Sequence, residues 1–287
     1  MLYVLCCMSL LLTFIISVRA CPLEYESTDE TELNNTLPLL NDTDIEDRTV
    51  ITDRQILWPS SSSGLVFIPY VNANLEPRVV NLLRHYIEQF SLHSCLRWVP
   101  RTHERDYVVF NRGNWGSDRC FAIIGRLGGP QHVNISERCL HFYQQRPDVH
   151  YIPHEMLHAL GFVHEHQRRD RECYIEVFGG ALQDYNNRIY TNFWTDITFP
   201  FDIHSVMQYR ASSIFRSLFG ETVGPLSEEM SMLDWMKLNY IYCRGPHICD
   251  TNYSLCANHK NILKQCIRRG ALPRNLLHVQ DSNWLNG

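Results

Sequence analysis

One stretch constrains this chain more than any other, and it runs from His154 to Glu165 in the pattern H-E-x-x-H-x-x-G-x-x-H-E. On a helix, His154 and His158 are separated by about 400°, which is a net 40°, and by about 6 Å along the axis, so both imidazoles project from one face. On a continuing helix, His164 would lie about 280° around the axis and roughly 15 Å from His154, out of reach of the same metal ion. The helix must therefore end between His158 and His164.

Gly161 predicts that ending, because glycine adopts the left-handed conformation that terminates helices at little steric cost. His164 can then fold back as a third nitrogen ligand. Three neutral nitrogens leave Zn²⁺ its full charge and an open position, where bound water acquires a pKa of about 7. Glu155 is placed to accept the proton of that water as a general base. A thermolysin-like site with Glu176 as third ligand is the alternative, although His164 makes it unnecessary.

The N-terminal 48 residues differ in composition from the rest of the 287-residue chain. Residues 1–20 are mostly apolar and end in a small-x-Ala pattern, which predicts a secretory signal peptide. Residues 21–48 carry nine acidic side chains and one basic side chain, and a segment so charged and so poor in apolar residues cannot fold alone. We predict that 21–48 is an acidic propeptide and that the protein is secreted and extracellular.

The remaining chain predicts no nucleic-acid partner and no transmembrane segment after the signal. The overall formal charge is −5, with no basic excess that would attract a phosphate backbone, and no later apolar run approaches the roughly 20 residues that span a bilayer.

Secretion makes the cysteines candidates for disulfide bonds. If Cys6, Cys7 and Cys21 are lost with the signal and the leader, eight cysteines remain and can pair completely. Sequons for N-glycosylation lie at Asn34, Asn41, Asn134 and Asn252.

Hydrophobic periodicity predicts an α+β fold before the metal string. Strands are predicted at 65–70, 95–99, 107–110 and 121–124, a helix at 77–90 with Val80, Leu83, Ile87 and Phe90 on one face, and a second helix at 151–163. Residues 244–287 are predicted to be a short, basic, Cys-containing tail.

The complete metal string resembles that of the astacin family of metzincin peptidases, and the resemblance covers about 49–243 as a catalytic domain. The further matching motifs are 166–171, Ser205–Tyr209, Trp58-Pro59, the spacing of Cys95, Cys120, Cys139 and Cys243, and the set Ser231, Asp234 and Asn239. The resemblance implies a two-lobed, metzincin-like α+β domain. In it, a twisted, mixed or mostly antiparallel sheet and the active-site helix lie above a more irregular C-terminal lobe, with a Met-turn under the metal.

The same resemblance implies a role for each matching residue. It makes His154, His158 and His164 the ligands of one Zn²⁺, Glu155 the general base, Met207 the apolar floor under the metal, and Tyr209 a fourth ligand at rest that swings to stabilise the oxyanion. Glu165 would meet the new N-terminal ammonium after activation. Cys95 would pair with Cys243 and Cys120 with Cys139. Cys173, Cys249, Cys256 and Cys266 are left with three possible connectivities.

Activation is expected to follow cleavage of the leader. The spacing back from Trp58 in the family predicts a mature chain that begins at Thr49, released by an activating protease that cuts near Arg48, with Arg54 as the competing site. Asp44 is the candidate latency residue that occupies the zinc before cleavage. A zinc-capping thiolate from Cys21 is the alternative.

The functional prediction is a secreted zinc-dependent endopeptidase that is made as a zymogen and acts on protein or peptide substrates. Two departures from the family support an alternative, a catalytically weak or inactive astacin-like binding or envelope protein. Gln208 stands where the family usually has His, and the segment between Tyr209 and Ser231, in a region that helps to wall the S1′ pocket, is shortened.

Overall fold

The computed structural model of this protein describes residues 56–113, 119–141, 148–178, 189, 196–210, 214–277, 282 and 284–285. The chain separates into the units Met1–Ile45 and Glu46–Gly287, and every described residue belongs to the second. The predicted signal peptide and propeptide, Asn34, Asn41, Asp44 and the predicted start at Thr49 lie outside the described residues. None of the described helices combines the length and the apolar character that a membrane span requires.

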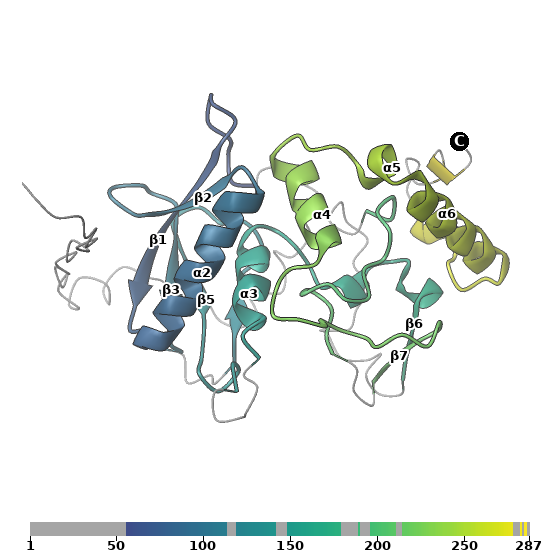
Figure 1. The fold of residues 1–287 in the computed structure, drawn as a ribbon, viewed down its shortest axis with the longest axis horizontal. Helices are drawn as coiled ribbons and strands as arrows, with labels where there is room; N and C mark the ends of the chain where they lie inside the picture. Colours follow the sequence, from purple (N-terminus) through teal and green to yellow (C-terminus); the bar gives the residue numbers. More distant parts are fainter. Residues whose placement is uncertain are drawn as a thin grey trace, which may run out of the picture. The chain divides into compact units, whose positions relative to one another are not determined.

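A five-stranded mixed sheet, in the order β2-β1-β3-β5-β4, builds the first part of the described unit (Figure 1). Its strands are β1 (Val66–Ala73), β2 (Leu96–Pro100), β3 (Tyr107–Asn111), β4 (Phe121–Ala122) and β5 (Pro130–Asn134). The predicted mixed sheet is confirmed, but three of its four strand pairings are parallel, and β4–β5 is the antiparallel one. Strands β1 and β2 pair in parallel because a helix connects them. The helix carries the chain back along the sheet, so that β2 starts at the same end as β1.

Two helices pack on this sheet beside each other, namely α2 (Pro77–His93) and α3 (Tyr151–Ala159) (Figure 1). The buried face of α2 consists of Val79, Leu83, Tyr86 and Phe90. The predicted face is therefore right for Leu83 and Phe90, whereas Val80 and Ile87 are only half-buried. Helix α3 contributes Ile152, Met156 and Leu157 to the same core, and this places the metal-binding pattern at the edge of a rigid, close-packed layer.

The second part of the unit has its own smaller core, with two short strands and several helices around it. Its elements are η2 (Glu165–Gln167), η3 (Arg171–Cys173), β6 (Ile175–Val177), β7 (Phe215–Ser217), α4 (Met232–Tyr242), α5 (Ile248–Thr251), α6 (Tyr253–Arg268) and η7 (Arg274–Leu276). Strands β6 and β7 pair antiparallel. This agrees with the predicted irregular C-terminal lobe.

The predicted Cys-containing tail after Cys243 is largely helical in the structure. Residues 248–251 and 253–268 form α5 and α6, and α6 buries Cys256, His259, Leu263 and Cys266 along one face. The spacing of three, four and three residues is helical, but two of its members are cysteines and one is a histidine, so an aliphatic pattern is missing. Leu263 and Cys266 pack into the second core beside Cys173 and Ile175, so the tail is part of that lobe.

Four disulfide bonds tie the described residues together. The structure pairs Cys95 with Cys243 and Cys120 with Cys139, and it resolves the open connectivities as Cys173–Cys266 and Cys249–Cys256. The Cys173–Cys266 bridge anchors α6 to η3, whereas Cys95–Cys243 holds the end of α4 at the start of β2.

The C-terminal end of α3 is fixed by a full set of hydrogen bonds. Gly161 has a φ of +97°, and the bonds from Gly161 N to His158 O (2.8 Å) and from Phe162 N to Leu157 O (3.0 Å) form a Schellman motif. The Trp58 indole donates to Ala159 O at 3.0 Å, and the Tyr242 hydroxyl donates to Leu160 O at 2.7 Å. The last carbonyl groups of the helix, which otherwise lack partners, are therefore all satisfied.

We expect Tyr242→Phe to lower the free energy of unfolding by about 1–3 kcal/mol, because the buried Leu160 carbonyl then loses its donor while the ring remains. Denaturant unfolding at fixed zinc concentration measures this loss. Tyr253→Phe is the matched control, since the Tyr253 side chain is 83% exposed, and it should leave stability unchanged. Equal stability of both variants would contradict the role given to Tyr242.

Candidate metal centre

The three histidines of the predicted site converge in the structure. His154 and His158 lie one turn apart on α3, and the turn at Gly161 brings His164 back beside them. One nitrogen from each ring lies within 4.8 Å of the other two, and the Nε2 atoms of His158 and His164 are 3.2 Å apart. His154 and His158 are buried, and His164 is half-buried.

The opposite nitrogen of each ring is held by an acceptor. His154 Nδ1 donates to Val206 O and His158 Nδ1 to Phe162 O, both at 2.7 Å. His164 Nδ1 donates to Gln167 Oε1 at 2.9 Å. A carbonyl oxygen can only accept, so the proton of each neutral ring sits on Nδ1 and the Nε2 lone pair faces the centre.

Burial keeps these rings neutral. It lowers the pKa of His154 to about 4 and that of His158 to about 3, in both cases against the opposing effect of the backbone acceptor. The pKa of His164 is lowered well below its usual value, first by burial and then by the neighbouring histidines. Neutral imidazoles are the form that ligates a metal ion.

The donor set fits Zn²⁺. Lone pairs of two Nε2 atoms that face each other at 3.2 Å repel unless a cation lies between them, and three imidazoles with fixed tautomers match the ligands of a catalytic zinc site. Glu155 adds a second unsatisfied group. Its carboxylate is buried, its Oε2 has no hydrogen-bond partner among the described residues, and burial raises its pKa well above the usual value. A buried acid with one unpartnered oxygen, on the helix that carries two of the three histidines, agrees with a site for a cation and its bound water.

The loop Ser205–Gln208 contacts the histidine cluster, because Val206 O accepts from His154 Nδ1 at 2.7 Å. Met207 is 2% exposed and lies in the core, and its carbonyl accepts from Glu165 N at 2.9 Å. Its role as the floor under the metal stays a prediction. Asp234 of α4 fixes this loop, because its carboxylate accepts from the Ser205 hydroxyl and from Val206 N. The sequence analysis gave Asp234 no role. The available signal was its position three residues after Ser231, which is the spacing of a capping box.

Tyr209 lies against the site. Its ring centroid is 4.4 Å from that of His164 and 6.3 Å from that of His154, and the side chain is half-buried. The Gln208 side-chain amide donates to the Tyr209 carbonyl at 3.1 Å. Gln208, which stands where the family usually has His, therefore contacts the backbone of the tyrosine.

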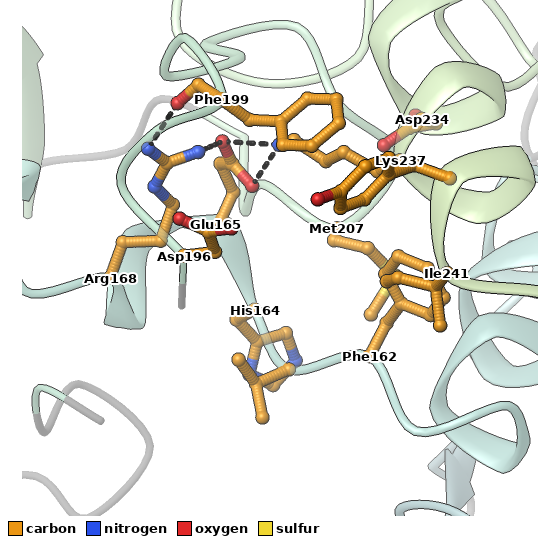
Figure 2. Close-up of a pocket in the computed structure, with 12 residues that line it drawn as sticks. Phe162, His164, Glu165, Arg168, Asp196, Phe199, Met207, Asp234, Lys237 and Ile241 are labelled. Carbon is orange, nitrogen blue, oxygen red and sulfur yellow. Dashed lines mark hydrogen bonds and ion pairs between the residues drawn. The ribbon is translucent and has the colours of Figure 1, made fainter. Parts of the chain in front are cut away.

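The Glu165 carboxylate forms ion pairs with two basic side chains of the same chain (Figure 2). Lys237 Nζ lies 2.8 Å from both of its carboxylate oxygens, and Arg168 donates to Oε1 at 2.9 Å. Burial would raise the pKa of Glu165, but Lys237 and Arg168 outweigh it and leave that pKa below its usual value. Sequence reasoning missed Lys237, whose only signal is its helical spacing three residues after Asp234.

Two of the predicted glycosylation sites lie in the described part of the chain. Asn134 is fully buried in β5 and its side-chain amide donates to Arg119 O, a geometry that leaves no room for a glycan in the folded domain. Asn252 is half-buried and caps α6 through its carbonyl oxygen, which accepts from Leu255 N at 3.1 Å. Of these two, only Asn252 stays a candidate.

Glu176, the alternative third ligand, is far from this role. It lies on β6 with a side chain that is 41% exposed and paired to Arg216. The group of described residues that gathers three free ligand nitrogens around one metal position is His154, His158 and His164.

The comparison with known proteins agrees with the site. A family model described as Astacin, a peptidase family, matches residues 51–243. The chain belongs to the astacin family. An astacin-like metalloendopeptidase of Gallus gallus is 27% identical over 92% of this chain, and the low choriolytic enzyme of Oryzias latipes is 31% identical over 64% of this chain and 68% of its own length.

A solved astacin structure supports the predicted fold. It is high choriolytic enzyme 1 of Oryzias latipes, a hatching enzyme zinc-protease, which is 26% identical, has a TM-score of 0.55, and covers 66% of this chain and 95% of its own. The α+β metzincin-like prediction is confirmed. This chain spans 65% of the length of the astacin-like metalloendopeptidases that it matches.

We expect Gln167→Ala to weaken zinc binding roughly 10- to 100-fold, because the variant removes the acceptor that orients the His164 ring of this astacin. Competition with a fluorescent zinc chelator measures the affinity. The control is Gln265→Ala, an exposed position on α6, which should bind zinc as tightly as the unaltered chain. An unchanged affinity in Gln167→Ala would show that the ring needs no such support.

Proposed function

We propose that this astacin is a secreted zinc-dependent endopeptidase that is made as a zymogen and hydrolyses protein or peptide substrates. The observation that carries the proposal is the convergence of three neutral histidines, each fixed by an Nδ1 acceptor, on one point, with Glu155 buried on the same helix as two of them. This arrangement has no evident structural purpose, since apolar residues would pack there at lower cost.

His154, His158 and His164 would hold the ion. When bound, zinc would supply a Lewis acid that polarises the substrate carbonyl and makes water acidic near neutral pH. Glu155 would accept a proton as the peptide carbonyl is attacked, and would then deliver it to the leaving amine. Its burial suits this task, because it raises the pKa of the carboxylate toward the range in which a group both takes and releases a proton.

Tyr209 would stabilise the transition state. Its phenol lies beside His164, and a hydroxyl that donates to the developing oxyanion of the tetrahedral intermediate strengthens binding of that state over the substrate. A resting position as a fourth ligand and a swing toward substrate are part of this proposal.

Secretion and activation rest on the sequence. The signal peptide 1–20, the acidic leader 21–48, the latency residue Asp44 and cleavage by an activating protease near Arg48 involve residues outside those that the structure describes. The disulfide bonds among the described residues support an oxidising compartment.

The arrangement favours an enzyme over the inactive alternative. A binding protein that only kept the fold would not need Glu155 in a buried position without a hydrogen-bond partner for Oε2, where an unpaired acid costs stability. The Gln208 contact to the Tyr209 backbone also preserves the position of the tyrosine.

Two measurements on one preparation test the proposal. The processed chain should contain one zinc ion by mass spectrometry, and it should cleave members of a peptide library in a way that a zinc chelator abolishes and added zinc restores. Bound zinc without cleavage of any peptide would favour the inactive binding protein. Absence of zinc would overturn the proposal.

A further inference from the structure

Helix α6 carries its basic side chains outside the face that is buried in the second core. Residues 252–277 contain no acidic side chain. Lys260, Lys264 and Arg268 follow one another at intervals of four residues, so they form a stripe along the helix with about 6 Å of rise between neighbours. Arg269 directly follows the helix. We call these four residues the α6 basic surface.

The charges of the α6 basic surface have no acidic partner in the part of the chain that the structure describes. Lys264, Arg268 and Arg269 are exposed, and none of them forms an ion pair or a side-chain hydrogen bond with another described residue. Lys260 is half-buried, and its ammonium lies over the Trp284 ring, 4.7 Å from the ring centroid. An aromatic ring leaves the positive charge of that ammonium uncompensated.

Exposed arginines elsewhere among the described residues are paired with acids. Arg78 forms an ion pair with Glu137 in the first lobe, and Arg216 forms one with Glu176 in the second. A local group of charges of one sign, without such counterparts, raises the electrostatic potential at the surface and attracts ligands of the opposite sign.

The helix dipole does not account for the whole stripe. Cations stabilise a helix when they lie in its last turn, near the unpaired carbonyl groups. In α6, this applies to Arg268 and the adjoining Arg269, whereas Lys260 and Lys264 lie before the last turn. These two lysines therefore add positive charge where the helix itself does not require it.

The apolar face of α6 is already occupied. Leu263 and Cys266 are fully buried in the second core, and a disulfide bond joins Cys266 to Cys173. A helix that binds in a membrane interface inserts its apolar face among the lipids, and α6 has no such face to offer. What α6 presents to a partner is positive charge on a helix that is held in place.

We propose that the α6 basic surface binds a linear polyanion of high charge density, of the chemical class of the sulfated polysaccharides found outside cells. Clusters of Lys and Arg bind such polymers, because each contact releases counterions that are condensed on the chain. Arg268 and Arg269 add planar guanidinium groups, which can bind the oxygens of an anionic group in pairs. The inference goes beyond the proposed function, since it makes no use of the metal centre and gives the C-terminal helix a binding role.

Immobilised heparin is the probe, and the full chain is the sample. We expect the chain to bind at about 50 mM salt and the affinity to fall roughly 100-fold at about 200 mM, as expected when about four charges displace counterions. Soluble heparin should compete for the chain, whereas heparin stripped of its sulfate groups should not.

Two variants that lose equal charge locate the site. The α6 variant combines Lys264→Gln, Arg268→Gln and Arg269→Gln, and it should bind heparin roughly 100-fold more weakly and with a smaller salt dependence. The control variant removes three exposed charges from the first lobe and should bind as the unaltered chain does; its changes are Arg78→Gln, Arg84→Gln and Arg105→Gln. Because all six side chains are exposed, both variants should keep the unfolding midpoint within about 2 °C.

Three results would overturn the proposal. The first is an equal loss of affinity in both variants, which would mean that net charge binds heparin and α6 does not. The second is a preference for polyglutamate or for vesicles that contain phosphatidylserine over heparin, which would indicate an acidic protein or a membrane. The third is no binding by the unaltered chain. Peptide hydrolysis is measured separately, so a chain that binds heparin but cleaves no peptide would contradict the proposed function alone.

Discussion

Glu155→Gln is expected to lower the turnover of a peptide substrate by about 10²–10⁴-fold, the range that general acid–base catalysis contributes, while the variant keeps its zinc. Glutamine has nearly the same shape but cannot accept and return a proton. The change also removes a buried acid without a hydrogen-bond partner for Oε2, so the variant should be at least as stable as the unaltered chain. Steady-state kinetics, with zinc content and unfolding measured on the same preparation, checks all three expectations.

Glu176→Gln is the matched control for that experiment. Its side chain lies on β6 at the surface, so the substitution should leave both zinc binding and turnover unchanged. The control also tests the thermolysin-like alternative, which makes Glu176 a ligand. Near-normal turnover in Glu155→Gln would refute the assignment of the base, and loss of zinc in Glu176→Gln would revive the alternative.

His164→Ala is expected to weaken zinc binding by at least about 100-fold. Zinc sites with four ligands bind with roughly 10–16 kcal/mol, which is about 3 kcal/mol for each ligand. Because His164 reaches the centre from outside α3, its removal leaves the helix and the other two rings in place. Isothermal titration or chelator competition measures the affinity, and peptide hydrolysis should fall with zinc occupancy.

An exposed histidine provides the control for this second prediction. His103 lies at the surface after β2, and His103→Ala should bind zinc and cleave peptides as the unaltered chain does. Excess zinc should restore part of the activity of His164→Ala if the defect is affinity alone. Unchanged affinity in His164→Ala would mean that another residue completes the site.

The sequence predicted the chemistry of the site more completely than its surroundings. The histidine spacing and Gly161 depend on local helix geometry, and the positive φ at Gly161 is where the pattern requires it. The acceptors that orient the rings are mostly backbone carbonyls, such as those of Val206 and Phe162. Every residue has a backbone carbonyl, so the residue types in a sequence cannot show which one accepts. Only Gln167, three residues from His164, was within reach of local reasoning.

The fold shows the same division. Periodicity located α2, α3 and the strands β1 to β4, but it gave no pairing order. It missed β5, β6, β7 and the helices α4, α5 and α6. Helix α6 escaped because its buried face includes two cysteines and a histidine, whose burial depends on a disulfide to η3 and on the buried contact between His259 and Tyr174. Contacts with residues far away along the chain therefore make the tail part of the second lobe.

By itself, the sequence determined the family and predicted the three ligands and the base, because these depend on residue types at fixed spacings within one helix and one turn. The tertiary structure alone decided which groups support them: Asp234 under the Met-turn, Tyr242 at the end of α3, and Lys237 on Glu165. Those contacts join residues that lie 28 to 82 positions apart. Only tertiary packing brings such residues together. Burial then strengthens each hydrogen bond and ion pair, because the local dielectric constant is lower than that of water.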